Sequence, residues 1–236
     1  MSANRGRGAS PSTRRSAGKR GRKRGSGKPA STDSRSEAWE ARELTPKNWT
    51  DFESFFAQYD GVQAGCWCMF YHREGPNGPL GSATRQEENR ADHERLLKQG
   101  HAQGILVYSK GRPVGWCQFG LREDLPRIER GRKYRAMPDL LADPPRWRIT
   151  CFFVDRGHRR KGVARFALRN ALGAMSRQGG GFVEAYPVTR PGAVENWFGS
   201  LDMFMSEGFR VIRPFGRSHL LVRKRLSPTG KRPPSG

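Results

Sequence analysis

The sequence predicts an α/β fold in which a mixed sheet is covered by helices. The apolar runs 104–109 and 113–119 have the character of strands, and Lys110-Gly111-Arg112 between them is typical of a hairpin turn. Further along, an apolar strand-like run at 147–154 is followed by a helical pattern at 163–177. A hairpin followed by strands that alternate with helices favours a sheet with both antiparallel and parallel neighbours.

The remaining elements follow from the same patterns. We expect further strands at 39–44, 182–188 and 219–226, and further helices at 45–58, 83–98 and 201–207. The first of these helices begins at Thr45 and Pro46, which are a preferred N-cap and a preferred first helical residue. The polar stretch 122–146 is too long for a turn, and we expect one short helix in it before Gly131. It is a candidate insertion on the substrate side.

The chain divides by composition into a domain at 37–227 and two tails. Residues 1–36 lack Leu, Ile, Val, Phe, Trp and Tyr, and they carry eleven Lys and Arg residues against one acidic residue, Asp33. Such a segment cannot bury enough apolar surface to offset its ordering entropy, so we expect it to be disordered, like the short tail 228–236. The N-terminal tail can serve solubility or attract nucleic-acid phosphates without sequence preference, and both roles stay open.

Charge and hydropathy limit the classes of binding partner that the sequence favours. Of the net charge of +22, the tail carries +10 and the rest of the chain +12, so the domain itself favours polyanions or an anionic cofactor. No apolar stretch reaches the length of a membrane span, and no apolar region of a secretory signal follows the basic N-terminus. We therefore expect a cytoplasmic protein without membrane contact. The oligomeric state is open, with a homodimer as one option.

The four cysteines predict neither disulfides nor a metal site. Cys117 and Cys151 lie in apolar strand-like runs, where a buried free thiol is the common state. Cys66 and Cys68 are separated by one residue, which is not the spacing of a zinc knuckle or of a thioredoxin-type pair. We interpret all four as reduced and structural.

A phosphate-binding turn is predicted where the strand 147–154 leads into the helix 163–177. The start of a helix presents unpaired N–H groups and the positive end of its dipole, and Gly162 lets an oxygen approach the backbone closely. Several cations surround this position: Arg159, Arg160, Lys161 and Arg165. The turn lacks the Lys-Ser or Lys-Thr of a Walker loop, and the chain has no G-x-G-x-x-G, so a nucleoside triphosphate or dinucleotide is disfavoured.

The run Val154-x-x-x-x-Arg159-x-x-Gly162-x-Ala164 resembles the acetyl-CoA signature R/Q-x-x-G-x-G/A of the GNAT superfamily of N-acetyltransferases. Gly115, the strand 183–187 and the late Glu207-Gly208-Phe209 extend the resemblance to about residues 38–226. It implies a mostly antiparallel sheet whose fourth and fifth strands splay apart. It also implies the residues that bind acetyl-CoA: Phe152, Phe153 and Val154 for the pantetheine, and Arg159, Arg160, Lys161, Gly162, Val163 and Ala164 around the pyrophosphate.

The usual catalytic residues of that superfamily are replaced in this chain. Phe204 stands where a tyrosine often protonates the leaving thiolate, and Arg148 stands where some members have a catalytic glutamate. Glu184 and Tyr186 share one face of the fifth strand and are our candidates for base and acid. The alternative is that Glu184 pairs with an arginine and Tyr186 only lines the site, and both interpretations stand. For the oxyanion we expect a backbone N–H near Phe153.

These observations predict transfer of the acetyl group of acetyl-CoA to a primary amine of a small molecule or protein, by direct attack in a ternary complex. A polyamine or aminoglycoside acceptor would require carboxylates, and the insertion contains five candidates: Glu123, Asp124, Glu129, Asp139 and Asp143. The alternative is a nucleic-acid-associated basic protein whose acyl-CoA domain is degenerate or regulatory. Neither function calls for a metal ion.

Overall fold

Seven strands form one mixed sheet in the computed structural model, which describes residues 38–74, 82–189 and 197–229. The strands are β1 (Trp39–Glu43), β2 (Gln103–Ser109), β3 (Arg112–Leu121), β4 (Trp147–Val154), β5 (Gly181–Ala185), β6 (Arg210–Pro214) and β7 (Leu220–Leu226). They are ordered β1-β2-β3-β4-β5-β7-β6, and only the β4–β5 pair is parallel. The predicted mixed, mostly antiparallel sheet is confirmed.

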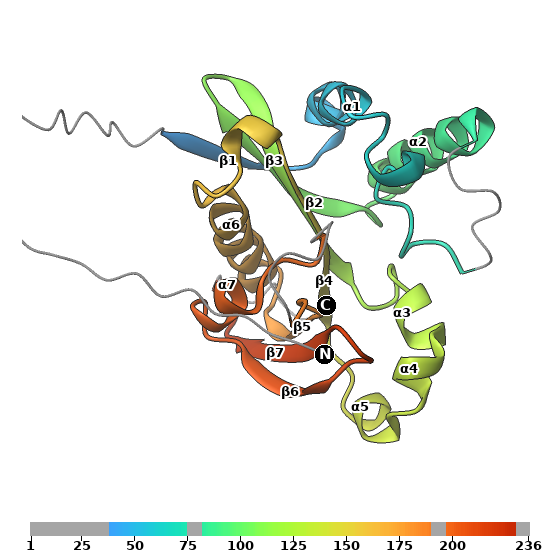
Figure 1. Cartoon of the computed structure of the whole chain (residues 1–236), viewed down its shortest axis with the longest axis vertical. Coiled ribbons are helices and arrows are strands. Elements are labelled where there is room, and N and C mark those ends of the chain that lie inside the picture. Colours follow the sequence, from blue (N-terminus) through green and yellow to red (C-terminus); the bar gives the residue numbers. More distant parts are fainter. Residues whose placement is uncertain (1–37, 75–81, 190–196, 230–236) are drawn as a thin grey trace, which may run out of the picture. The chain divides into compact units, whose positions relative to one another are not determined.

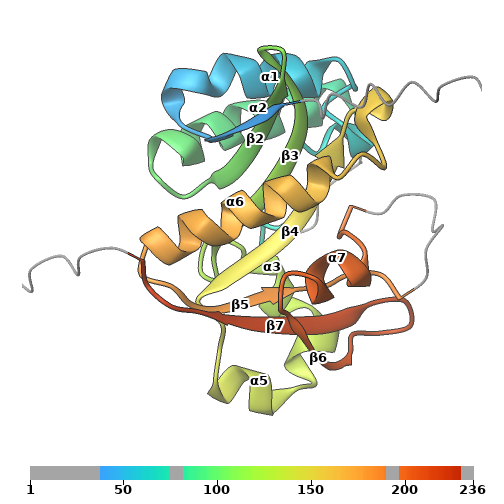
Figure 2. The same ribbon diagram turned by 90° about the vertical axis from the view of Figure 1, so that its left-hand side faces the viewer.

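Helices cover both faces of this sheet (Figures 1 and 2). The long ones are α1 (Trp49–Ala57), α2 (Ala83–Lys98) and α6 (Val163–Arg177), and the short ones are α3 (Arg127–Arg130), α4 (Arg132–Arg135), α5 (Pro138–Ala142) and α7 (Leu201–Met205). Single turns of 3₁₀ helix occur at η1 (Pro46–Asn48), η2 (Gln63–Gly65) and η3 (Arg156–His158). Because side chains alternate along a strand, Ile105 and Val107 pack toward α6, while Leu106 and Tyr108 pack toward α1.

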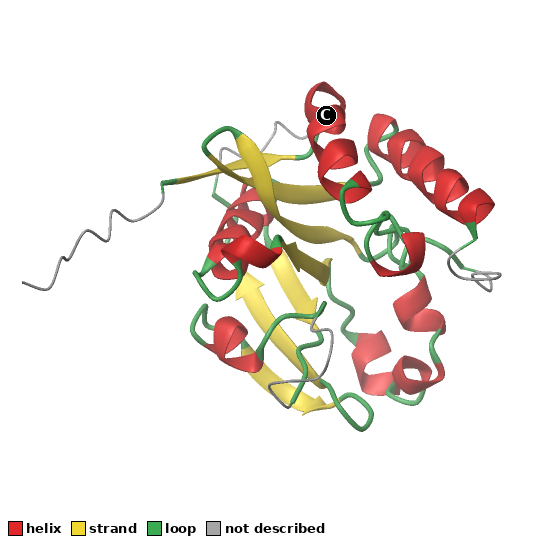
Figure 3. Cartoon of the chain, turned by 45° about the horizontal axis from the view of Figure 1, so that its top comes forward, coloured by secondary structure: helices red, strands yellow, loops and turns green. Residues whose placement is uncertain are grey.

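The structure corrects the predicted elements in three places. The insertion 122–146 holds three short helices, α3 to α5, where one was expected (Figure 3). The fifth strand ends at Ala185 rather than at 188, because Pro187 has no N–H to donate and Val188 makes only isolated bridges. Strand β6 was not predicted, since it is a mostly exposed edge strand without clear alternation.

Both predicted tails lie outside the described residues, apart from Pro228 and Thr229, so their disorder stays a prediction. In the described parts of the chain, none of the helices combines the length and apolar character that a membrane crossing requires. Within the same residues, no group of three or more His, Cys, Asp or Glu side chains is arranged to hold a metal ion.

Gly115 lets the start of α6 lie directly on the sheet. It sits in β3, and a Cβ built on it would lie 2.5 Å from Cγ1 of Val163, the first residue of α6. Val163 is itself buried, so it cannot swing out to make room. The glycine therefore sets the distance between β3 and the predicted phosphate-binding turn.

We predict that Gly115→Ala lowers the free energy of unfolding by about 1–3 kcal/mol, because the added methyl group overpacks against Val163. Urea denaturation measures this change. Gly173→Ala in α6 is the matched glycine-to-alanine control, because its new Cβ meets only the end of the Arg177 side chain at 3.4 Å. That control should be neutral or slightly stabilising, and equal stability of both variants would contradict the proposed role of Gly115.

Candidate active site

The β4–β5 pair is short and opens toward the end of β4. Its parallel pairing stops at Ile149 and Ala185, after three residue pairs. On the other side of β4 the register with β3 shifts, because Gln118 lies opposite Cys151 and the next pair skips Thr150. Thr150 is thus the extra residue of a β-bulge, which bends a strand and increases its twist. The two central strands splay as the family resemblance implies.

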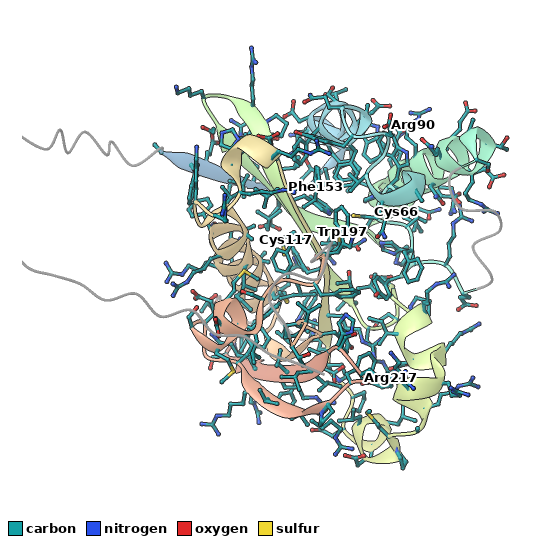
Figure 4. The ribbon with its side chains drawn as sticks, viewed as in Figure 1. Cys66, Arg90, Cys117, Phe153, Trp197 and Arg217 are labelled. Carbon is teal, nitrogen blue, oxygen red and sulfur yellow. The ribbon has the colours of Figure 1, made fainter. Side chains whose placement is uncertain are left out.

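A segment of the chain itself lies in the gap between the diverging strands. The backbone N–H of Phe152 donates to the carbonyl oxygen of Trp197 at 2.6 Å, and Ser200 forms a parallel bridge with Val188 beyond β5. The ring of Phe153 stacks on that of Trp197 at a centroid distance of 5.9 Å (Figure 4). A ligand that pairs with the amide of Phe152 therefore has to replace the Trp197 carbonyl.

The predicted phosphate-binding turn is exposed and shaped for an anion. Arg160 and Gly162 both have left-handed backbone, with φ of +61° and +95°. Gly162 is the N-cap of α6 and has no side chain to cap the helix, and the first turn carries no acidic residue. Residues 159–162 are exposed, Val163 is buried and Ala164 is half-buried. Backbone N–H groups in such a turn form an anion-binding concavity.

Asp155 holds this turn to the end of α1. Its carboxylate accepts hydrogen bonds from the hydroxyl of Tyr59, from the N–H of Gly157 at 3.0 Å and from the ring of His158 at 2.7 Å. Burial and the bond to Asp155 raise the pKa of Tyr59 to about 12, so the hydroxyl keeps its proton. Nε of Arg159 donates to the carbonyl of Val154 at 3.1 Å, which ties the first predicted cation back to β4.

Glu184 and Tyr186 meet on one face of β5, as predicted. Glu184 is fully buried and accepts from the Tyr186 hydroxyl at 2.8 Å, from Tyr134 at 3.1 Å and from Nε of Arg223 at 2.7 Å. Burial raises the pKa of Tyr186 well above its usual value, and the neighbouring carboxylate adds to the shift. The ion pair with Arg223 is the partner that the structural alternative for Glu184 requires.

The carboxylates of the insertion are engaged in ion pairs that fasten it to its surroundings. Glu129 pairs with the buried Arg148 at 3.0 Å, and Asp139 pairs with Arg213 at 2.5 Å. The two remaining pairs are Asp124 with His101 at 2.8 Å and Asp143 with Arg223 at 3.6 Å. These contacts weaken the case for a polycationic acceptor, because four of the five carboxylates, all but the exposed Glu123, already have partners among the described residues.

Two replaced catalytic positions have structural roles. Phe204 is fully buried in α7, and its ring meets that of Phe152 at a centroid distance of 5.9 Å. Arg148 is fully buried, and its guanidinium lies over the ring of Tyr134 at 5.1 Å. Neither side chain can supply an acid or a carboxylate base.

Sequence reasoning missed a network that holds the turn between α1 and α2. Asn89 donates to the carbonyl of Gly65 at 2.9 Å, and His93 contacts the carbonyl of Trp67 through Nδ1 at 2.7 Å. Gln118 reaches the carbonyl of residue 68 from β3 at 2.7 Å. Burial lowers the pKa of His93 to about 4, so at neutral pH the ring is uncharged and its Nδ1–H donates.

The turn that this network holds is strained. Five of its non-glycine residues have left-handed backbone: Asp60, Val62, Ala64, Trp67 and Cys68. Each such residue costs on the order of 1 kcal/mol or more and persists only where the surroundings over-determine it. No sequence signal pointed to the side chains that hold this strained turn, because α2 shows no periodicity that separates its buried polar residues from its exposed ones.

Comparison with known proteins assigns the central part of the chain. Residues 79–193 match the profile of the acetyltransferase (GNAT) family. The chain contains a GNAT-family domain. This match includes the bulged strand β4 and the turn before α6, so the GNAT signature and the observed geometry fall on the same residues. Comparison with curated protein sequences gave no match.

Solved structures similar to this GNAT domain include yncA from Salmonella typhimurium, determined with acetyl-CoA, at 14% identity and a TM-score of 0.47, covering 84% of this chain and 99% of that one. A ribosomal-protein-alanine N-acetyltransferase from Brucella melitensis has 15% identity and a TM-score of 0.46, covering 79% and 99%. PaiA N-acetyltransferase from Thermoplasma acidophilum, in complex with coenzyme A, has 12% identity and a TM-score of 0.45, covering 80% and 99%. The family assignment rests on the sequence match.

Proposed function

We propose that this protein is an N-acetyltransferase that binds acetyl-CoA and transfers its acetyl group to a primary amine by direct attack in a ternary complex. The observation that carries this proposal is the uncapped start of α6, where Arg160 and Gly162 turn the backbone into the left-handed region directly after the bulged strand β4. The pyrophosphate of acetyl-CoA fits this concavity, and its pantetheine fits the gap beside β4.

The backbone of β4 can stabilise the oxyanion of the reaction. A neutral amine attacks the thioester carbonyl, the carbonyl oxygen gains negative charge, and the carbon–sulfur bond then breaks to release the CoA thiolate. The N–H of Phe152 points into the gap, whereas strand alternation turns the N–H of Phe153 toward β3. We therefore assign the oxyanion contact to Phe152 rather than to Phe153.

Tyr186 is the proposed acid for the thiolate, and Glu184 is the proposed base or its positioning partner. Glu184 lies opposite Arg148 within the β4–β5 pairing, Tyr186 directly follows the last residue pair, and a hydrogen bond of 2.8 Å couples the two side chains. A proton given by Tyr186 leaves a phenolate that the carboxylate of Glu184 disfavours and the guanidinium of Arg148 favours. The acceptor is a primary amine on a small molecule or a protein.

The alternative function is that of a nucleic-acid-associated protein with a degenerate or regulatory acyl-CoA domain. The net charge of +22 supports an affinity for phosphate backbones. A salt-sensitive affinity for nucleic acid that is lost on removal of residues 1–36, with no acetyl transfer, would favour it. A cytoplasmic location and a homodimer stay predictions under either function.

For acetyl-CoA binding, we predict that wild type binds in a calorimetric titration and that Gly162→Asp binds roughly tenfold or more weakly than Gly162→Asn. Asp and Asn are nearly isosteric and both tolerate left-handed backbone, so the pair differs mainly in the charge brought to the pyrophosphate. Equal affinities of the two variants would contradict binding of the pyrophosphate at this turn. A wild type without affinity would reject acetyl-CoA as the donor.

For the proton transfers, we predict that Tyr186→Phe slows turnover by roughly tenfold or more while the affinity for acetyl-CoA changes little. Glu184→Gln should also unfold more easily, by about 3–5 kcal/mol, because the largely buried Arg223 loses its closer carboxylate and keeps only Asp143 at 3.6 Å. Turnover and urea denaturation measured on both variants separate the two roles. Normal turnover of Tyr186→Phe would return this residue to the structural role.

A further inference from the structure

Two neighbouring cysteines of the turn after α1 meet a distant cysteine of β4 beside the proposed transfer point, and we call the three the thiol cluster: Cys66, Cys68 and Cys151. The first two belong to the strained turn after α1, and the third belongs to β4. Cys68 is buried in the hydrophobic cluster against which Cys151 packs, and the neighbouring thiols of Cys151 and Cys66 add to the effect of burial in raising the pKa of the Cys68 thiol. Its sulfur also accepts a hydrogen bond from Nε1 of Trp116 at 3.1 Å. Spacing alone suggested four separate structural thiols, and the fold instead brings three of them together.

The surroundings give the two thiols of the turn different chemistry. Hydrogen bonding from Cys68 lowers the pKa of the Cys66 thiol. Cys68 is 3% exposed, and burial raises the pKa of its thiol. Cys66 is half-buried, so a reagent can reach it. A partly exposed thiol that is stabilised as thiolate is reactive. A buried protonated thiol beside it can then attack the oxidised sulfur with its electron pair and release its proton.

The backbone of the turn is built to keep these sulfurs in place. Left-handed conformations at Trp67 and Cys68, with φ of +45° and +56°, are unfavourable for residues with side chains. The carbonyls of these two residues are held by the buried side chains of His93 and Gln118. A cysteine that served only as a small apolar filler would not need this arrangement, because it could pack equally well on relaxed backbone.

We propose that the thiol cluster is an oxidation site in which Cys66 reacts with a hydroperoxide and Cys68 resolves the product. The thiolate of Cys66 attacks the terminal oxygen of the hydroperoxide, and the O–O bond breaks. The other oxygen leaves with the electron pair, as an alkoxide or, from hydrogen peroxide, as hydroxide, so that Cys66 becomes a sulfenic acid. The thiol of Cys68 then displaces the sulfenic hydroxyl group as water. The two thiols together lose two electrons and two protons and form a Cys66–Cys68 disulfide.

Oxidation at this place reaches the proposed reaction centre through β4. Cys151 contacts Cys68 and directly precedes Phe152, whose N–H faces the gap. A disulfide alters the packing of Cys68 against Cys151 and pulls the turn away from the carbonyl contact that Gln118 makes. We therefore expect acetyl transfer to stop on oxidation and to return with dithiothreitol. This consequence rests on the proposed function, whereas the thiol chemistry does not.

The test uses the full-length protein and mass spectrometry. Reduced wild type is treated with iodoacetamide, and the labelling rate of each cysteine is followed by peptide mass. Cys117 is the internal control, because it is fully buried on the opposite face of β3. Cys66 should react roughly tenfold or more faster than Cys117, and the excess should grow with the thiolate fraction as the pH rises. Equal rates at the two residues in the folded protein would overturn the proposal.

A second arm identifies the product. Hydrogen peroxide should convert wild type to a form with a Cys66–Cys68 disulfide, and in Cys68→Ser dimedone should trap a sulfenic acid on Cys66. A disulfide between other cysteines, or a dimedone adduct on Cys151 alone, would contradict the assignment. If Cys68→Ser fails to fold, the disulfide map of oxidised wild type decides. Loss of acetyl transfer is scored separately, so reduced protein that forms the disulfide but never transfers acetyl groups refutes only the proposed function.

Discussion

The parting of β4 and β5 is the constraint on which the rest of the structure depends. The two strands pair in parallel for three residues and then separate, and the extra residue Thr150 accompanies the separation. In the interior of a sheet, backbone N–H and C=O groups are normally satisfied by the neighbouring strand, so a gap must be filled by something else. Here Trp197 supplies a carbonyl to Phe152, and acetyl-CoA is the proposed competitor for the same amide.

The start of α6 completes this arrangement because β4 leads directly into it. Gly115 allows the helix to lie against β3, and Asp155 holds the connecting turn to Tyr59 at the end of α1. The turn is thus positioned from both faces of the sheet before any ligand arrives. Positioning of this kind lowers the entropic cost of binding a flexible, highly charged molecule.

Charge compensation governs the other half of the domain. Glu184 is buried among Tyr134, Tyr186 and Arg223, and the insertion is fastened by further ion pairs to arginines. A buried carboxylate without such partners would be costly, and the largely buried side chain of Arg223 supplies the opposite charge. This explains why a chain that resembles acetyltransferases lacks their usual base and acid: at position 148 an arginine that balances buried charge stands in place of the glutamate.

The sequence predicted local features well and long-range meetings poorly. The bounds of β4 and α6 were predicted as the structure has them, because a continuous apolar run and a helical period identify each element. The place of the turn at Gly162 followed from the motif, whereas its left-handed backbone was not predicted. By contrast, the hydrogen bonds from Asn89 and His93 to the strained turn depend on which side of a polar helix is buried. The meeting of Cys68 with Cys151 depends on tertiary packing, and neither feature leaves a periodic signal in the sequence.

Hydrogen exchange of the full-length protein with and without acetyl-CoA tests the central claim most directly, because the claim concerns individual backbone N–H groups. Acetyl-CoA should slow exchange at the end of β4, including Phe152, and in the segment from Arg159 through the first turn of α6. The interior of α2 serves as the internal control, and its exchange should be unaffected. Unchanged exchange in β4 and α6, or protection confined to other segments, would contradict the account.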